Sequence, residues 1–168
     1  MMLIEWRGDV LRIMREITPV DSSETSPGDY HVLQDVLGCL TELGETQRRV
    51  VLREIDGKNS KIVSFIKEKE AVHPVRSMTD LKCRLGGRGR ICFGLFHSSS
   101  RSAVPLAFVY IALLDSVPSS IYPILTGELK PRYVARPSVA VFYSITQPHP
   151  GLAGYRLGGY QIFLAIER

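Results

Sequence analysis

The feature that most constrains the fold is a change of hydrophobic period along the 168 residues. Before about residue 87 most apolar side chains recur at helical spacing, as in Trp6, Val10 and Ile13. Later, three nearly continuous apolar runs occupy residues 91–96, 106–114 and 139–145, each of a length typical of a strand. Helices followed by a run of strands are typical of an α+β chain, which is the fold class we expect.

Two helical stripes open the chain. The first runs from Trp6 to Ile17 and should stop at Thr18-Pro19, because a residue before proline disfavours helical geometry. The second runs from Leu33 to Leu40, and Gly44 is placed to end it. Two such helices cannot bury both stripes without further partners. We therefore predict that residues 1–48 are the end of a helical domain and that residues 49–168 form a second domain.

The second domain begins with a predicted strand at residues 50–55, ended by the turn dipeptide Asp56-Gly57. Asn59 or Ser60 should cap a helix, and Ser77 with Asp80 has the form of a capping box before another helix that ends at Gly86-Gly87. Residues 118–137 are expected to be irregular, with breaks at Pro123, Gly127, Pro131 and Pro137. A last helix is predicted at residues 160–166.

Charge and cysteine content narrow the function. The net charge is +4, and residues 88–168 carry 8 basic and 3 acidic side chains. This excess of basic residues favours an anionic partner, either a phosphorylated small molecule or nucleic acid. The alternative is that the charged side chains only keep the surface solvated. Cys39, Cys83 and Cys92 lack metal-ligand spacing and indicate reduced thiols in an intracellular compartment. We find no membrane-spanning run, secretory signal or C-terminal Ser-Lys-Leu address.

The segment with the clearest chemical meaning is rich in glycine and joins a predicted strand to a predicted helix. Glycines let the backbone approach a ligand, and the first amides of a helix bind phosphate oxygens. We therefore predict a pyrophosphate-binding loop, to which an arginine adds a charged contact, although glycines needed only for close packing give the same pattern. It matches neither the dinucleotide fingerprint nor the P-loop. The loop comprises Gly151, Leu152, Ala153, Gly154, Tyr155, Arg156, Leu157, Gly158 and Gly159.

The histidines are weaker candidates. His73, beside a proline at a helix break, is expected to have a structural role. His97 precedes three serines, but no acidic residue is identifiable that would orient a serine–histidine pair, so we expect a polar turn. His149 lies beside the glycine-rich loop and is not assigned to catalysis. The strand aromatics are expected to be core residues, and they do not form the basic-aromatic platform of RNA-binding sheets.

Several segments together resemble the malonyl-CoA decarboxylase family. The resemblance covers nearly the whole chain and is specific from Glu70 onward. Its motifs are Glu70-Ala71-Val72-His73-Pro74-Val75-Arg76-Ser77, then Asp80-Leu81-Lys82-Cys83-Arg84-Leu85, Arg90-Ile91-Cys92-Phe93-Gly94-Leu95-Phe96-His97, Pro105 to Leu113, and Val141-Phe142-Tyr143-Ser144-Ile145-Thr146-Gln147 leading into the glycine-rich loop. Departures are Met78, Tyr110, Ala112-Leu113-Leu114 and Gly159, where relatives usually have tryptophan, glutamate, a run ending in threonine, and a polar residue.

This resemblance implies an incomplete GNAT-like mixed sheet, of the acyl-CoA N-acyltransferase type, with the glycine-rich segment as its CoA-pyrophosphate loop. It implies decarboxylation of malonyl-CoA to acetyl-CoA and carbon dioxide, a carboxy-lyase reaction of fatty acid metabolism. No metal or cofactor is expected beyond the CoA of the substrate. The family's catalytic serine and histidine lie in motifs downstream of the loop, so no catalytic residue is assigned and the chain is expected to be a fragment.

The resemblance also implies a homo-oligomer that assembles through the helical domain, without nucleic acid or membrane as partner. Relatives occur in cytoplasm, mitochondrion and peroxisome, so the compartment stays open. Two alternatives remain for the function. One is a non-catalytic CoA-binding or oligomerisation module of the same fold, and the other is a GNAT-type acyltransferase.

Overall fold

The computed structural model describes residues 2–17, 34–38, 50–87, 89–98, 104–127 and 137–168. The chain forms two compact units, residues 1–49 with 149–156 and residues 50–148 with 157–168. The predicted stop at Thr18-Pro19, the ends of the second helical stripe, its stop at Gly44, Cys39 and most of the turn after His97 fall outside the described residues. The expected division into domains 1–48 and 49–168 stays a prediction. The structure assigns residues 149–156 to the same unit as the N-terminal helix.

The first unit contains helix α1 (Met2–Ile17), a helical turn at residues 34–38, and the 3₁₀ turn η1 (Pro150–Leu152). Helix α1 confirms the first predicted helix. Its apolar stripe is only partly covered, since Trp6 is 51% exposed. No described helix of the chain is long and apolar enough to cross a bilayer.

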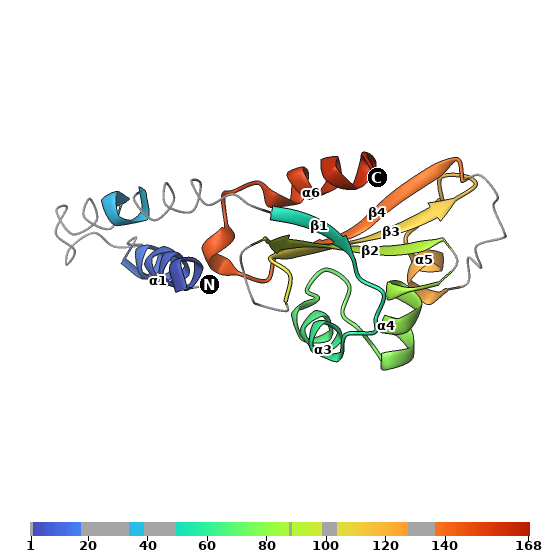
Figure 1. The fold of residues 1–168 in the computed structure, drawn as a ribbon, viewed down its shortest axis with the longest axis horizontal. Helices are drawn as coiled ribbons and strands as arrows, with labels where there is room; N and C mark the ends of the chain where they lie inside the picture. Colours follow the sequence, from blue (N-terminus) through green and yellow to red (C-terminus); the bar gives the residue numbers. More distant parts are fainter. Residues whose placement is uncertain (1, 18–33, 39–49, 88, 99–103, 128–136) are drawn as a thin grey trace. The chain divides into compact units, whose positions relative to one another are not determined.

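The second unit is built on a four-stranded sheet in the order β1-β2-β3-β4 (Figure 1). Its strands are β1 (Val50–Glu54), β2 (Arg90–His97), β3 (Ala107–Leu114) and β4 (Val139–Thr146). All four predicted strands are confirmed within one or two residues, and the α+β class with them. The three strand pairs are antiparallel, so the described sheet contains none of the parallel pairing that we expected of a mixed sheet.

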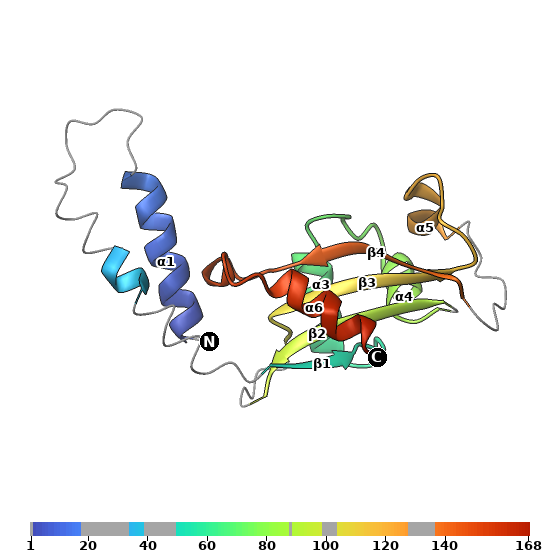
Figure 2. The same ribbon diagram turned by 90° about the horizontal axis from the view of Figure 1, so that it is seen from above.

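Helices cover both faces of this sheet. Figures 1 and 2 show α3 (Ser60–Lys69) and α4 (Met78–Leu85) on one face and α6 (Leu157–Ile166) on the other. We call the first the α3–α4 face and the second the α6 face. The short helix α5 (Tyr122–Thr126) packs on the α3–α4 face through buried Ile124. We expected residues 118–137 to be irregular, and this was wrong for α5. Pro123 lies in its first turn and Gly127, at φ +73°, ends it, so the residues that we interpreted as breaks are its boundaries.

Strand β3 shows why the predicted strands are almost continuously apolar in sequence. Phe108, Tyr110 and Ala112 point to the α3–α4 face, whereas the residues between them point to the α6 face. All of these side chains are buried, because helices cover both faces. Strand β4, which pairs with β3, contains a bulge. Tyr110 pairs with Ser144 and Ile111 with Phe142, so Tyr143 is the extra residue.

Capping residues determine where helices α3 and α4 begin. The Asn59 side chain accepts hydrogen bonds from the amides of Lys61 and Ile62, which caps α3. The Ser77 hydroxyl oxygen accepts from the Asp80 amide at 3.0 Å, as the capping box predicts. The Asp80 carboxylate bonds the amide of Arg76, one residue before the cap, in place of the expected Ser77 amide.

Candidate functional site

The structure divides the nine residues of the predicted phosphate loop between the two units. Residues 151–156 form η1 and the turn after it, within the first unit. Leu157, Gly158 and Gly159 are the first turn of α6, within the second unit. Positive φ values occur at Gly154 (88°) and Arg156 (51°). Binding of a substrate by these nine residues stays a prediction.

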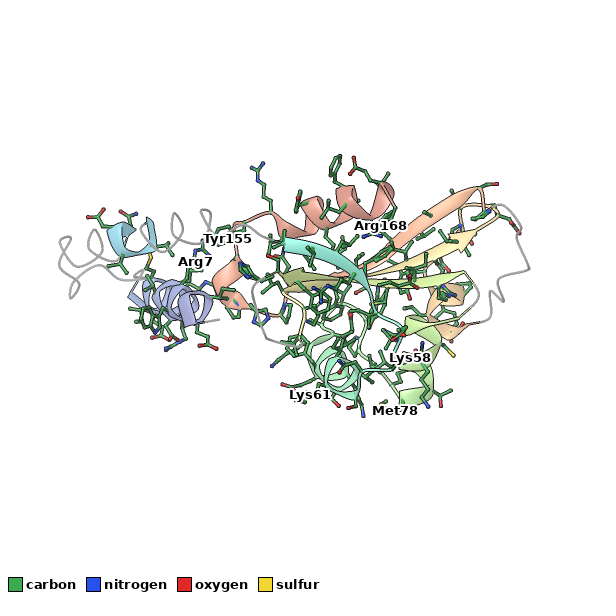
Figure 3. All side chains as sticks on the ribbon, in the orientation of Figure 1. Arg7, Lys58, Lys61, Met78, Tyr155 and Arg168 are labelled. Atoms are coloured by element: carbon green, nitrogen blue, oxygen red, sulfur yellow. The ribbon has the colours of Figure 1, made fainter. Side chains whose placement is uncertain are left out.

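Within the first unit, Gly151 is required for packing. A Cβ atom on Gly151 would lie 1.7 Å from the carbonyl oxygen of Ile4, so helix α1 leaves no room for a side chain there. Arg7, itself buried, donates hydrogen bonds to the carbonyl oxygens of Gly151 (2.6 Å) and Ala153 (2.8 Å). Its guanidinium also lies over the Tyr155 ring, 4.5 Å from the ring centre. Both residues are labelled in Figure 3. Arg7 therefore holds η1 and the following turn in a fixed conformation. At Gly151 the structure supports the packing interpretation that the sequence left open.

The start of α6 has a different character. A Cβ atom on Gly158 would lie 3.3 Å from Ile145 Cγ2, so this glycine lets α6 approach β4 closely. A Cβ atom on Gly159 would meet nothing within 4 Å. The first amides of an α-helix have no acceptor inside the helix and sit at the positive end of its dipole. The first turn of α6 has such amides, and the space beside the Cα of Gly159 is open.

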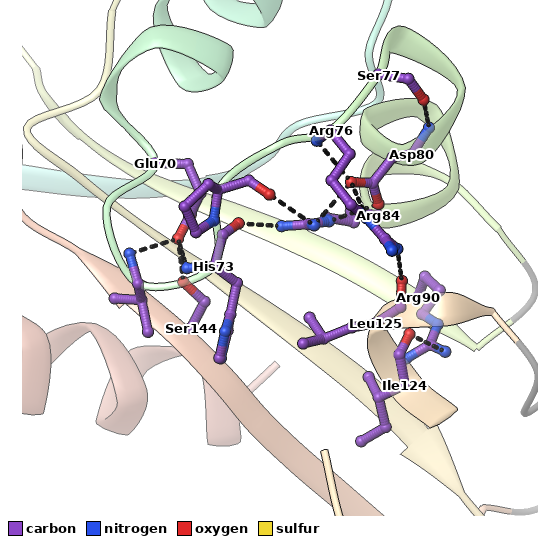
Figure 4. Close-up of polar contacts among 12 residues, drawn as sticks. Glu70, His73, Arg76, Ser77, Asp80, Arg84, Arg90, Ile124, Leu125 and Ser144 are labelled. Carbon is purple, nitrogen blue, oxygen red and sulfur yellow. Dashed lines mark hydrogen bonds and ion pairs between the residues drawn. The ribbon is translucent and has the colours of Figure 1, made fainter. Parts of the chain in front are cut away.

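Glu70 forms the polar centre of the α3–α4 face and was missed as a site residue. Its carboxylate accepts hydrogen bonds from the Ser144 hydroxyl at 2.9 Å and the Thr146 hydroxyl at 3.3 Å, both on β4 (the Ser144 bond is drawn in Figure 4). The amides of Val72 and His73 donate to the same carboxylate at 3.0 and 2.9 Å. Glu70 is buried, and no lysine or arginine of the described residues pairs with it. It fastens the segment after α3 to the carboxyl end of β4.

Arg84 holds the same segment from the other side. Its guanidinium donates to the carbonyl oxygen of His73 at 2.5 Å and, more weakly, to that of Pro74 at 3.4 Å. It also forms two hydrogen bonds to the Asp80 carboxylate, at 2.9 and 2.8 Å. Burial alone would raise the pKa of Asp80. The bonds from Arg84 and the Arg76 amide outweigh this, so the pKa lies below its ordinary value. The segment 70–74 thus has a fixed position on the sheet.

A sequence signal for this cluster existed. Ser144 and Thr146 are polar residues two apart in an apolar strand, which places both hydroxyls on one face. Their acidic partner could not be found from the sequence, because Glu70 lies 74 residues from Ser144. His73 contributes through its backbone, and this agrees with the structural role that we predicted.

The remaining candidates are simple to place. His97 ends β2 and is half-buried, and His149 precedes η1. Cys92 is a buried free thiol whose pKa burial raises, and Cys83 is a free, exposed thiol. Among the residues that the structure describes, no group of three His, Cys, Asp or Glu side chains is arranged to hold a metal ion.

Comparison with known proteins identifies the family of this chain. Residues 49–167 match the family described as malonyl-CoA decarboxylase C-terminal domain. Mitochondrial malonyl-CoA decarboxylases of Anser anser anser and Rattus norvegicus are each 35% identical, over 108 and 109 residues. These matches cover 63% of this chain and 21% and 22% of the relatives, so the matched region is about a fifth of their length.

Solved structures agree with this result. Malonyl-CoA decarboxylase from Rhodopseudomonas palustris matches with a TM-score of 0.78 and 30% identity, over 98% of this chain and 38% of the other. The enzyme from Agrobacterium vitis matches with the same TM-score and 28% identity, over 98% and 37%. The sequence resemblance is confirmed by the family match and by the shared fold: this chain belongs to the malonyl-CoA decarboxylase family.

Proposed function

We propose that this chain supplies the CoA-binding half of a malonyl-CoA decarboxylase. The observation that carries the proposal is the glycine-rich connection from β4 to the first turn of α6, inside the region that matches the family. In the reaction, the bond between the carboxylate carbon and Cα of the malonyl group breaks. Carbon dioxide leaves, the electron pair stays on the thioester as an enolate, and a proton then converts it to acetyl-CoA.

In this proposal the chain binds and orients the substrate. Amides at the start of α6 hold the diphosphate of CoA. Oriented donors near the thioester oxygen stabilise the enolate, and a general acid returns the proton. The reaction takes no metal or organic cofactor besides the CoA of its substrate. We assign no residue of this chain to the proton transfer.

Further parts of the proposal concern the surroundings of the enzyme. We propose an intracellular protein, because two of its relatives are named mitochondrial and its three cysteines show no disulfide or metal spacing. Its partners are malonyl-CoA and acetyl-CoA, with no nucleic acid or membrane. The helical part, residues 1–48, mediates self-assembly.

Gly159 gives a clean test of CoA binding. Gly159→Glu places a carboxylate at the open position beside the first amides of α6, whereas Gly159→Gln adds nearly the same volume without charge. We expect Gly159→Glu to weaken CoA binding more than tenfold, or about 1.4 kcal/mol, and Gly159→Gln to weaken it less than threefold. Calorimetric titration of the chain with CoA measures both. An acidic residue stabilises a helix start, so unfolding would not explain the loss. Equal affinities of both variants and the unchanged chain would refute the phosphate site.

Turnover separates the decarboxylase from its alternatives. Malonyl-CoA incubated with a protein that joins this chain to the family's serine and histidine motifs should give acetyl-CoA and carbon dioxide in equal amounts, measured by chromatography and gas capture. CoA binding without turnover favours the non-catalytic module. Transfer of an acyl group to an added amine, with free CoA released, favours the acyltransferase.

A further inference from the structure

Among the residues that the structure describes, Arg90 is a buried cation without an acidic partner. It begins β2 and is 9% exposed, and Nη2 donates to the carbonyl oxygen of Ile124 at 3.0 Å (Figure 4). Its Nη1 has no hydrogen-bond partner, and its guanidinium lies 5.9 Å from the ring centre of Tyr143. Burial lowers the pKa of this guanidinium, because no carboxylate stabilises its charge. An ion removed from water without a counter-charge is destabilising by several kcal/mol. The fold therefore retains Arg90 at a substantial cost.

A cavity of about 220 Å³ lies directly against Arg90, on the α3–α4 face. Its charged lining residues are Arg76, Asp80, Arg84 and Arg90. Asp80 is already engaged by Arg84 at 2.8 Å and approached by Arg76 at 3.7 Å. Three cations face one carboxylate, so the cavity carries an excess of positive charge.

The start of α4 is a second source of donors in the same cavity. Ser77 and Thr79 line it, and Ser77 is the cap of this eight-residue helix. Because Ser77 Oγ accepts from the Asp80 amide, its hydroxyl hydrogen remains available to donate. The first turn of α4 also directs the positive end of the helix dipole toward its cap. Helix start and buried arginine are independent features that favour the same kind of ligand.

We propose that this cavity binds a small phosphate group, held by the first turn of α4 and by the charge of Arg90. Donors from the start of α4 and from the Arg76 side chain suit a tetrahedral oxyanion better than a planar carboxylate. Arg90 lines the same cavity, but its Nη1 is covered from solvent, so Arg90 contributes through its charge. The site is separate from the α6 start, because α6 lies on the opposite face of the sheet.

Cys83 provides a reporter, since its exposed thiol lines the same cavity. The rate at which neutral iodoacetamide alkylates Cys83 is followed by mass spectrometry of the peptide that contains it. Inorganic phosphate is titrated at constant ionic strength, with chloride as the replaced anion. We expect phosphate to slow alkylation saturably, by fivefold or more. A rate that does not change with phosphate overturns the proposal.

Variants test which residues bind. Arg90→Met should lose the protection, Arg90→Lys should keep it within about threefold, and Arg53→Gln on exposed β1 should leave it unchanged. Because Arg90→Met risks misfolding, Thr79→Glu adds a carboxylate at an exposed position of the same cavity, and Thr79→Gln is its matched control. We expect Thr79→Glu alone of this pair to abolish protection. Protection that persists in Thr79→Glu overturns the proposal.

Competing anions test the ligand class. Malonate is a dicarboxylate, and glycerol 3-phosphate carries the phosphate as a monoester. Protection at a lower concentration of the monoester than of inorganic phosphate assigns the site to an organic phosphate, and the reverse order assigns it to free phosphate. Either order supports the proposal. Protection at a lower concentration of malonate than of both phosphates overturns it.

Discussion

The α3–α4 face and the α6 face are built on the same four strands, yet they bury different chemistry. On the α6 face the buried side chains that the strands contribute are apolar, namely Leu52, Phe93, Leu95, Ala107, Val109 and Ile111. The single buried polar side chain that α6 adds is Gln161. On the α3–α4 face, Glu70, Arg84 and Arg90 are buried together with two tyrosines. Apolar packing holds both faces, and the α3–α4 face has specific polar bonds in addition.

The difference indicates what each face does. Apolar packing tolerates small shifts of a helix, because it has no preferred direction. Hydrogen bonds have narrow limits of distance and angle, and each unmade bond to a buried group is destabilising. Glu70 and Arg84 thus fix segment 70–74 on β4, near the point where the chain enters the glycine-rich loop. We infer that polar bonds on the α3–α4 face fix segment 70–74, whereas apolar packing holds the body of α6 on the sheet.

The largest expected effect is that of Arg84→Met. This change leaves the Asp80 carboxylate without its two charged bonds and removes the donor to the His73 carbonyl. Breaking a buried pair by removing one partner costs about 3–5 kcal/mol of unfolding free energy. Urea unfolding followed by circular dichroism measures it. Arg12→Met removes an arginine paired with Asp9 and Glu16 on the exposed surface of α1, and should cost less than about 1 kcal/mol. Similar losses in both variants would abolish the contrast between polar face and surface.

The pH dependence of this loss gives a second measurement. The pKa of Asp80 lies below 3.8 in the folded chain, so its ion pair stabilises the fold above that pH. The contribution disappears as the pH falls through the lowered pKa. In Arg84→Met the carboxyl stays buried without its partner and prefers the protonated form. The stability difference between the two proteins should therefore shrink as the pH is lowered from 7 to below 3.8. A constant difference would show that the Asp80 charge is irrelevant.

A smaller effect, of opposite sign, is expected for Tyr110→Phe. The Tyr110 hydroxyl is buried and has no hydrogen-bond partner, and burial raises its pKa. Its ring stacks on Tyr143 at 5.6 Å, a contact that phenylalanine keeps. Removal of an unsatisfied hydroxyl should stabilise the chain by about 1 kcal/mol in thermal unfolding. Tyr122→Phe, at a 61% exposed position, should change stability by less than about 0.5 kcal/mol. A destabilised Tyr110→Phe would mean that the hydroxyl has a partner.

The sequence predicted the elements of both faces because their signals are local. Asn59 and Ser77 cap their helices through contacts within three residues, and the apolar runs follow the strand period. The α5 helix was missed for the opposite reason. At five residues it has almost no period, and its Pro123 and Gly127 are typical of a loop as well as of helix ends.

The contents of the site were harder to predict, because they depend on distant partners. Glu70 bonds Ser144 across 74 residues, and Arg7 bonds Gly151 across 144. Neither pair has a spacing that a motif records. The glycine-rich loop was visible in the sequence, but the space around its glycines differs between its two ends. Gly151 is required by helix α1, whereas Gly159 has free space around its Cα, and composition alone does not separate these cases.

The smallest effect is expected on the α6 face, for Gln161→Met. The Gln161 amide nitrogen donates to the carbonyl oxygens of Phe93 at 3.0 Å and Ala107 at 3.4 Å, but its oxygen is buried without a partner. Replacement by methionine loses these bonds, which is destabilising. It also removes the unsatisfied oxygen and adds apolar contact, which is stabilising, so the two contributions to the unfolding free energy nearly cancel. We expect the unfolding free energy to change by less than about 1 kcal/mol in urea titration. A loss above about 2 kcal/mol would mean that the α6 face, too, is held by a specific polar bond, because packing alone would not discriminate between side chains of such similar size.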